Sequence, residues 1–399
     1  MMATDQEEAM SEFPTIRVSG SPHERGRQYG EAARDRVRIS IDAYRDVFAH
    51  YAGWDWAKVT DEALRYAEPV RAFDERYVEE MRGLAEGAGV AFDEVLAINT
   101  RSEIMFAAKA RAAGGQPRTP AECTSFAVLP EASADGHTLI GQNWDWLPYS
   151  FDTCIVLEVQ QDDGPDYVTV VEAGLLAKTG MNSSGIGLAA NALVSDADRG
   201  VPGVPFHLLL RGILDAENLS GALTVLQRGF RSSSANYLVG HRDGIAVDVE
   251  GAPGDFSRLF LLFPDHGVLA HANHFLSPSF DGKDVSLWVM PDSPFRLERI
   301  RSQVAAARDA LSIETFQTAL ADHANYPSGV CCHPDTRDGP LDQGATVASV
   351  LMDLDTRRMW LADGQPCSHP YRTIDYDDFL SKPSRVAAAD SSPAHRVPA

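Results

Sequence analysis

The spacing of apolar positions along the chain changes character at about residue 123. Before that point, apolar side chains recur three and four positions apart, which predicts amphipathic helices over residues 21–51, 60–86 and 93–110. The first of these begins at a capping box, with Ser21 as N-cap, Pro22 at the first helical position and Glu24 three residues after the cap. We therefore expect about the first 110 residues to be mostly helical.

From Cys123 onward, short β-prone segments flank turn sequences such as Asp135-Gly136 and Arg242-Asp243-Gly244. Strands are predicted over residues 124–129, 138–144, 154–160, 167–172, 176–181, 186–190, 236–240, 245–250, 260–263, 267–271, 345–353 and 358–362. Helical spacing returns over residues 204–229, 294–310 and 313–323. Hairpins kept apart from helices in this way predict an α+β fold class, with antiparallel sheets and helical layers outside them.

The two ends of the chain are polar and aperiodic, which is typical of disordered tails. A loop rich in glycine and proline over residues 112–120 separates the helical part from the strands. The predicted organisation is a disordered acidic N-terminus (1–18), a helical segment (19–122), a sheet-rich region (123–380) and a disordered tail (381–399).

Composition restricts the partners. The 399 residues include 35 Lys and Arg against 57 Asp and Glu, a net charge of −22, which argues against nucleic-acid and anionic-membrane partners. No apolar stretch approaches the roughly 18 residues of a spanning helix. Residues 1–8 are acidic and lack a signal-peptide pattern, so we expect a cytoplasmic protein. An odd number of cysteines, 5, does not suggest a disulfide framework and directs attention to single thiols.

Cys123 is the most informative of these thiols. It follows the Gly/Pro loop immediately and begins a predicted hairpin strand. If the chain were cut before it, the new α-amine, with an ordinary pKa of about 7.7–8.0, would be a base next to its own thiol. Taken by itself, however, a cysteine that begins a strand is more often a small buried residue.

Short motifs surround Cys123 in a fixed order. They are Asn99-Thr100-Arg101-Ser102-Glu103, Cys123-Thr124-Ser125-Phe126, Gly141-Gln142-Asn143-Trp144-Asp145, Glu172-Ala173-Gly174, Lys178, Gly180-Met181-Asn182-Ser183-Ser184-Gly185, Asn191-Ala192-Leu193, His271-Ala272-Asn273-His274, Asn325-Tyr326-Pro327 and Gly344-Ala345-Thr346. With these motifs, about residues 19–366 resemble the acyl-CoA:6-aminopenicillanic-acid acyltransferase (isopenicillin N acyltransferase) family of peptidase C45-like, autoprocessing N-terminal-nucleophile hydrolases.

The resemblance implies a four-layer αββα fold and self-cleavage between Glu122 and Cys123 into α and β chains that stay associated. Cys123 would be the nucleophile, acting through a thioester. Asp145 would orient or polarise its amine and thiol, the Asn273 amide would stabilise the oxyanion, and Asn191 would supply a second, backbone donor. We expect hydrolysis of a small N-acyl amide or thioester. Acyl transfer in secondary metabolism, including β-lactam side-chain exchange, and an uncut, non-catalytic binding protein remain alternatives.

Other residues near these motifs have two interpretations each. Trp144, Trp146, Tyr149 and Phe151 could line an acyl pocket or belong to the core. Arg101 and Glu103 could form a buried pair that positions the processing loop, or a plain helix ion pair.

The metal-ligand signals are weak. His271 and His274 lie in a strand-like run that would point them to opposite faces, and the adjacent Cys331 and Cys332 rarely chelate one ion together, even with His333 beside them. We therefore predict no metal and no organic cofactor, and keep a zinc hydrolase as an alternative.

Three positions depart from the penicillin-acylating relative. Gln343 and Cys332 stand where that relative has arginine, and Arg337 is a candidate substitute. Glu122 stands where it has glycine before the cut. These departures question the penicillin substrate more than the fold, because an arginine supplies a fixed positive charge near a thiolate or carboxylate.

Overall fold

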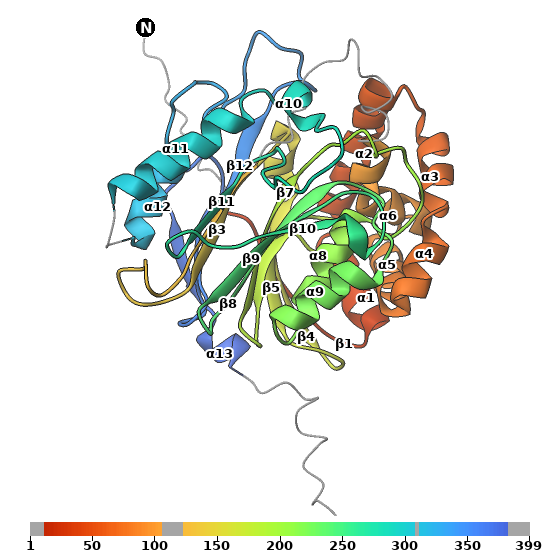
Figure 1. Ribbon diagram of the computed structural model, residues 1–399. Coiled ribbons are helices and arrows are strands. Elements are labelled where there is room, and N and C mark those ends of the chain that lie inside the picture. The colour runs from red at the N-terminus through yellow and green to blue at the C-terminus, as the bar shows by residue number, and fades with distance from the viewer. Residues whose placement is uncertain (1–11, 106–122, 308–310, 382–399) are drawn as a thin grey trace, which may run out of the picture.

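Two β-sheets pack face to face between layers of helices in the computed structural model, which describes residues 12–105, 123–307 and 311–381 (Figure 1). The larger sheet has 8 described strands in the order β1 (Thr15–Gly20), β4 (Cys154–Gln161), β5 (Tyr167–Glu172), β6 (Thr179–Asn182), β7 (Ile186–Ala192), β8 (Ala235–His241), β9 (Ile245–Gly251) and β10 (Leu259–Leu262). The smaller sheet has 6, in the order β11 (Val268–His271), β2 (Cys123–Val128), β3 (Leu139–Trp146), β12 (Ala345–Asp353), β13 (Arg358–Ala362) and β14 (Arg372–Asp375).

Helices cover the outer face of each sheet. The larger sheet carries α8 (Phe206–Leu214) and α9 (Leu219–Arg228), with the N-terminal helices α1 (Pro22–Ala32), α2 (Arg34–Ala52), α3 (Trp56–Leu64), α4 (Ala67–Phe73), α5 (Glu75–Ala88) and α6 (Phe92–Asn99) beside them on the right of Figure 1. The smaller sheet carries α11 (Ser293–Ala306) and α12 (Ile313–Leu320) on the left. Short turns of helix are η1 (Pro148–Asp152), η2 (Phe256–Arg258), α10 (Ser286–Val289) and α13 (Asp377–Leu380). The α+β fold class and its four αββα layers are thus confirmed.

Two adjacent interior strands of the smaller sheet, β2 and β3, position the candidate nucleophile. β2 pairs antiparallel with β3, and Cys123 lies opposite Trp144. Every residue of both strands is buried, because the larger sheet covers one face and helices cover the other. On the helical side, Phe126 of β2 stacks on Phe316 of α12 with ring centroids 3.7 Å apart. Cys123 therefore begins a strand that is fixed from both sides.

The structure corrects the predicted N-terminal boundary. Disorder was expected through residue 18, but Thr15–Gly20 forms β1 and pairs in parallel with β4. Ile16 and Val18 are buried by this pairing. The strand was missed because it lies at an edge of the sheet and pairs with residues about 140 positions away. The predicted disorder of residues 1–11 and 382–399 concerns positions outside the described residues.

The predicted helical regions contain helices, but most of these helices are shorter than the residue ranges predicted from the apolar spacing. Residues 60–86 form parts of three helices, with breaks at Arg65–Tyr66 and at Asp74. Asp74 separates α4 from α5, because its side chain accepts a hydrogen bond from the Arg76 amide and caps α5. α5 crosses α1 closely, since a Cβ at Gly26 would lie 2.0 Å from the Glu80 carbonyl oxygen. The capping box at Ser21 and Glu24 is formed as predicted.

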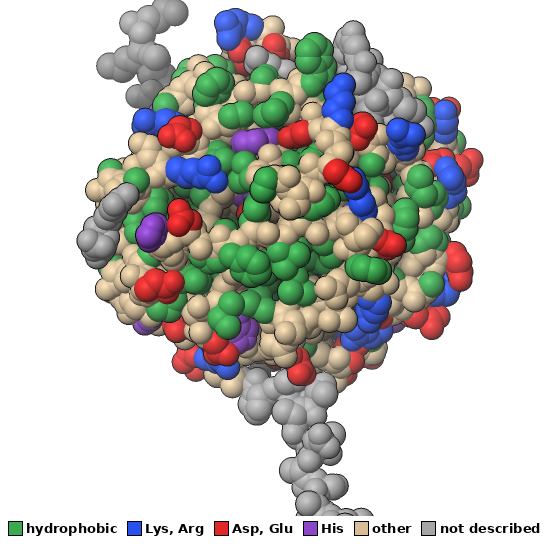
Figure 2. Space-filling model, viewed as in Figure 1, with side chains coloured by type: hydrophobic (Ala, Val, Ile, Leu, Met, Phe, Trp, Pro, Cys, Tyr) green, Lys and Arg blue, Asp and Glu red, His purple; other side chains and the backbone are tan. Residues whose placement is uncertain are grey.

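On the face drawn in Figure 2, basic side chains are interspersed with acidic ones, and apolar side chains gather near its centre. The helices described here include none with both the length and the apolar character needed to cross a membrane.

Candidate active site

The main chain of Cys123 is held by three side chains from distant parts of the sequence. Its N–H donates to Oδ1 of Asn273, 2.7 Å away. Its carbonyl oxygen accepts from Nδ2 of Asn191 at 3.1 Å and from the Arg296 guanidinium at 2.8 Å. The structure therefore brings together Cys123, Asn191 and Asn273, as the sequence analysis expected.

The roles of the two asparagines are not quite those expected. Asn191 reaches Cys123 through its side-chain amide, whereas a backbone donor was predicted. Its Oδ1 accepts from the Ser125 hydroxyl at 2.6 Å, so the amide orientation is fixed. Asn273 uses Nδ2 to donate to the carbonyl oxygen of Ala192 at 2.9 Å. Because an amide NH₂ has two hydrogens, this bond leaves Asn273 a second donor.

Arg296 joins these contacts, and the sequence analysis missed it. It projects from α11, is 1% exposed and pairs with Asp292 at 2.8 Å. Besides the Cys123 carbonyl, it donates to Oγ1 of Thr124 and to Oδ1 of Asn273, each at 3.0 Å. The i,i+4 spacing from Asp292 was the available signal, but this spacing is common to many surface ion pairs.

The Cys123 thiol lies in a buried and charged environment. Burial raises its pKa, whereas the ammonium group of Lys178 opposes the rise and the main-chain N–H of Asp145 donates to it. Lys178 is itself buried, which lowers its pKa, and its nitrogen lies 5.0 Å from the centre of the Trp144 ring. A thiolate at Cys123 would therefore have a cation near it.

Asp145 follows Trp144 on β3 and is buried beside Cys123. Its Oδ1 accepts from the Thr346 hydroxyl at 2.5 Å, while Oδ2 has no hydrogen-bond partner among the described residues. Burial raises the pKa of Asp145 to about 7, although Arg296 and the Thr346 hydroxyl favour its charged form. The carboxyl group can therefore change its protonation state near neutral pH.

A cavity borders the Cys123 thiol. It is lined by Arg101, Ser102, Met105, Cys123, Trp144, Asp145, Trp146, Lys178, Ala192, Phe206 and His207. Of the predicted aromatic cluster, Trp144 and Trp146 line the cavity. The Trp146 indole donates a hydrogen bond to the Tyr149 hydroxyl at 3.0 Å, and Phe151 packs against the core. The cavity combines apolar ring faces with cationic groups.

Arg101 and Glu103 do not pair with each other, which corrects one prediction. Two positions apart on a helical turn, their side chains point in different directions. Arg101 instead forms a buried ion pair with Glu172 at 2.9 Å, and its guanidinium carbon lies 4.4 Å from the centre of the Trp146 ring. Glu103 accepts from the Phe206 amide at 2.7 Å, and burial raises its pKa to about 7.

Several predicted residues lie away from this cavity. Gln343 donates to the Asp338 carbonyl at 3.0 Å, and the Arg337 side chain is 81% exposed and paired with Asp335. Neither lines the cavity, so Arg337 does not replace the expected arginine; Arg296 is the arginine at Cys123. Glu122, the predicted residue before the cut, lies outside the described residues.

The proposed zinc-hydrolase ligands are also separate. His271 bonds Glu250 at 2.8 Å, and His274 bonds Ser293 at 2.7 Å. Neither histidine belongs to the group of potential metal ligands found among the described residues, which includes Cys331 and His333. The ligand set of the zinc-hydrolase alternative is therefore not assembled among the described residues.

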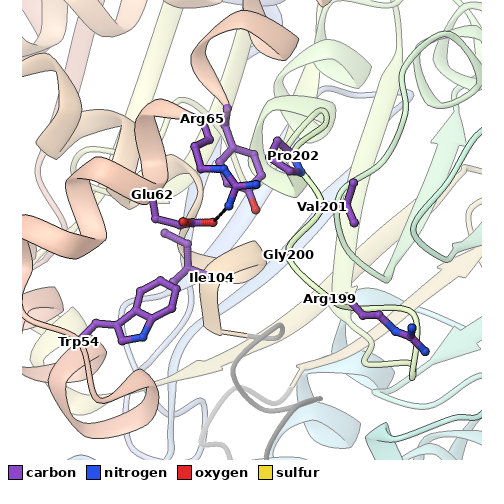
Figure 3. Close-up of a pocket in the computed structure, with 9 residues that line it drawn as sticks. Trp54, Glu62, Arg65, Ile104, Arg199, Gly200, Val201 and Pro202 are labelled. Carbon is purple, nitrogen blue, oxygen red and sulfur yellow. Dashed lines mark hydrogen bonds and ion pairs between the residues drawn. The ribbon is translucent and has the colours of Figure 1, made fainter.

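A larger outer pocket of about 360 Å³ lies between α3 and the loop at Arg199–Pro202 (Figure 3). It is lined by Trp54, Glu62, Arg65, Tyr66, Ile104, Arg199, Gly200, Val201 and Pro202. Ile104 belongs to the helical turn over residues 101–105, which also lines the Cys123 cavity. The same helical turn therefore contributes lining residues to both pockets.

Comparisons with known proteins agree with the motifs around this site. The sequence model of the family "Acyl-coenzyme A:6-aminopenicillanic acid acyl-transferase" matches residues 132–368. The acyl-coenzyme A:6-aminopenicillanic-acid acyltransferase 40 kDa form of Emericella nidulans is 28% identical over 360 residues, which cover 88% of this chain and 92% of that protein. An uncharacterized protein of Archaeoglobus fulgidus is 23% identical over 402 residues, covering 90% of this chain and 66% of that protein.

Among solved structures, a variant of conjugated bile acid hydrolase from Clostridium perfringens matches with a TM-score of 0.46 and 16% identity, covering 65% of this chain and 94% of that one. Penicillin V acylase from Agrobacterium tumefaciens matches with a TM-score of 0.42 and 15% identity, covering 65% of this chain and 88% of that one.

Proposed function

Because the chain belongs to the acyl-coenzyme A:6-aminopenicillanic acid acyl-transferase family, we propose that it is an autoprocessed cysteine amidohydrolase or acyltransferase. In this proposal it cleaves itself before Cys123 and then transfers an acyl group from a small amide or thioester through a Cys123 thioester. The observation that supports it best is the set of contacts at Cys123: Asn273 on its N–H, Asn191 and Arg296 on its carbonyl oxygen, and Asp145 at its thiol.

Self-cleavage would begin with attack of the Cys123 sulfur on the carbonyl carbon of Glu122. The carbon–sulfur bond forms, the carbon–nitrogen bond breaks, and the thiol proton is transferred to the departing nitrogen, which gives a thioester and a free α-amine. Water then attacks the thioester, releasing the Glu122 carboxylate and restoring the thiol. Asn273 already contacts the nitrogen that leaves, and it would hold the new amine near the sulfur.

The mature enzyme would repeat the same chemistry on a substrate. The α-amine takes the thiol proton, the sulfur bonds to the acyl carbon, and the proton passes to the leaving amine or thiol. Water, or an amine in a transferase, then accepts the acyl group. The free hydrogen of the Asn273 amide is the donor that we assign to the oxyanion, and one such donor typically contributes about 2.7–4 kcal/mol to transition-state stabilisation.

We further propose that the acyl part of the substrate lies against Trp144, Trp146 and Phe206, whose rings border the thiol. Transfer of large apolar surface from water favours binding there at about 25 cal/mol per Å². The outer pocket in Figure 3 would then receive the other part of the substrate, because it shares the residue 101–105 turn with the nucleophile's cavity. Hydrolysis is our first choice, and β-lactam side-chain transfer is the second.

The proposal is tested by intact mass and N-terminal sequencing of the wild type beside Cys123→Ala. We expect two wild-type fragments, one beginning at Cys123, and an uncut 43.4 kDa chain for the variant. Cys154→Ala is the matched control, because Cys154 is also a buried cysteine at the first position of a strand, and this variant should cleave normally. A folded wild type that stays uncut would refute autoprocessing and favour the binding-protein alternative.

The substrate class is tested separately. A panel of small N-acyl amides and thioesters would be incubated with cleaved enzyme, with and without added amines. Release of free acid without an amine identifies a hydrolase, whereas a product that requires the amine identifies a transferase. Cleaved, folded enzyme that releases no acyl group from any member of the panel would contradict the proposed substrate class.

A further inference from the structure

Four metal-ligating side chains converge near the surface, away from the residues that line the Cys123 cavity. They are His323, Cys331, His333 and Cys367, and one nitrogen or sulfur atom of each lies within 4.8 Å of the others. His333 Nε2 is 3.1 Å from His323 Nε2, 3.5 Å from Cys331 Sγ and 3.4 Å from Cys367 Sγ. The adjacent Cys331 and Cys332 in the sequence disfavour a shared metal ion, whereas the fold brings Cys331 together with Cys367 from another loop.

These separations match the edges of a zinc coordination tetrahedron. Zinc lies about 2.0–2.1 Å from histidine nitrogen and about 2.3 Å from cysteine sulfur. A regular tetrahedron with those radii has nitrogen–nitrogen edges of about 3.3 Å and nitrogen–sulfur edges of about 3.5 Å. Two thiolates and two neutral imidazoles also balance the charge of Zn²⁺, so the occupied site would add no net charge.

The cluster is held in place by the main chain and by one buried side chain. The Cys331 amide donates to the Asp322 carbonyl at 3.0 Å, and the His333 amide donates to the Pro327 carbonyl at 2.9 Å. Asn143 of β3 donates through Nδ2 to the Val330 carbonyl at 2.8 Å. Cys331 is buried, while His323 and Cys367 are exposed, so an ion can enter from solvent. A fixed backbone and an entry path are both properties of real metal sites.

We propose that His323, Cys331, His333 and Cys367 bind one structural Zn²⁺ in a closed Cys₂His₂ site. Both thiols lose their protons to solvent when the ion binds. All four positions are taken by protein ligands, so the ion stabilises structure and leaves no open position for a substrate. It would join the loop after α12 to the loop between β13 and β14. This inference is independent of the proposed acyl chemistry.

The ion would also lie next to a connection that leads to the active site. Cys332, between two of the ligands, donates its amide to the Thr346 hydroxyl at 2.9 Å, and that hydroxyl donates to Asp145. The Thr346 amide in turn donates to the Cys332 carbonyl at 3.0 Å. An ion that holds the Cys331–His333 segment in place would therefore also hold the Thr346 hydroxyl, which hydrogen-bonds Asp145.

The test is the metal content of untagged full-length protein, purified in metal-free buffer after growth with zinc and measured by mass spectrometry of the elements. We expect about one zinc per chain in the wild type, and at least a tenfold loss in Cys367→Ser and His323→Asn. Both positions are exposed, so these variants leave the core filled, and circular dichroism checks that they fold. Cys332→Ser is the matched control and should keep its zinc.

Two further measurements use the wild type alone. Cobalt(II) added to metal-free protein should give the intense visible absorption of a tetrahedral thiolate site. Each tenfold rise in free Zn²⁺ above its Kd should lower the unfolding equilibrium constant tenfold. Wild type without zinc or a cobalt spectrum, a Cys331–Cys367 disulfide found by mass, or folded ligand variants with undiminished zinc would each overturn the proposal.

Discussion

Thr346→Val tests whether the charge state of Asp145 controls the chemistry at Cys123. The substitution keeps the shape of the side chain and removes the hydroxyl that donates to Oδ1 of Asp145 at 2.5 Å. A hydrogen bond to a charged group is worth about 1.5–3 kcal/mol. Because one pKa unit corresponds to about 1.36 kcal/mol, the pKa of Asp145 should rise by about one to two units. The rise starts from a pKa of about 7 in the wild type.

The pKa of Asp145 rises because the substitution removes a contact that stabilises the charged form of its carboxyl group. The Thr346 hydroxyl stabilises the carboxylate, so its removal favours the neutral acid. At pH 7 the ionised fraction of Asp145 should fall from about one half to about 0.1–0.01, which predicts a 5- to 50-fold slower reaction if the carboxylate is required. The rate should recover as the pH is raised toward 9, because the carboxylate is then restored.

The assay is kcat/KM for acyl release between pH 5 and 9.5, measured on cleaved enzyme with one small thioester. The acid limb of the profile should move to higher pH in Thr346→Val. Ser349→Ala is the control, because Ser349 lies on the same strand but its hydroxyl pairs with Tyr371 at 2.6 Å. An unmoved acid limb in Thr346→Val, or an equal movement in Ser349→Ala, would show that the contact with Asp145 does not set the pH dependence.

Three further changes test other contacts. Arg101→Gln removes one partner of the buried pair with Glu172 and should lower the free energy of unfolding in urea by about 3–5 kcal/mol. Lys178→Met removes the cation that most strongly lowers the pKa of the Cys123 thiol. The thiol pKa should therefore rise, and alkylation by iodoacetamide at pH 8 should slow. Gly26→Ala places a methyl group 2.0 Å from a carbonyl oxygen of α5 and should cost about 1–3 kcal/mol or more in thermal unfolding.

Residues of the same types at exposed or half-buried positions supply the controls for these changes. Arg71 pairs with Glu68 at the surface, so Arg71→Gln should change stability by no more than about 1 kcal/mol. Lys58→Met should leave alkylation of Cys123 unchanged. Gly221→Ala, where the nearest atom to the new methyl group is 3.5 Å away, should be neutral or stabilising. Equal effects in a control and its test variant would mean that burial at the test position is not the cause.

The sequence predicted most of the strands, and it placed the candidate nucleophile at the start of one of them, because these features depend on local patterns. β2 and β3 are β-prone segments on either side of the Asp135-Gly136 turn, and the motif ending in Asp145 lies 22 positions after Cys123. Arg296 contacts Cys123 from 173 positions away, and nothing in its own neighbourhood indicates that contact. The complete set of proposed zinc ligands was missed for the same reason, since Cys331 and His333 stand together in the sequence but Cys367 is 34 positions from His333.

The contacts of Cys123 also explain how a chain could be cut there without losing its active geometry. Asn191 and Arg296 hold the carbonyl oxygen of Cys123, and β2 pairs it with β3; both attachments lie on the C-terminal side of the proposed cut. Only the nitrogen changes on cleavage, and Oδ1 of Asn273 can accept a hydrogen from an amine as well as from an amide. In the proposed mechanism, the residue that would attack Glu122 in a precursor is therefore already in the position from which it would attack a substrate.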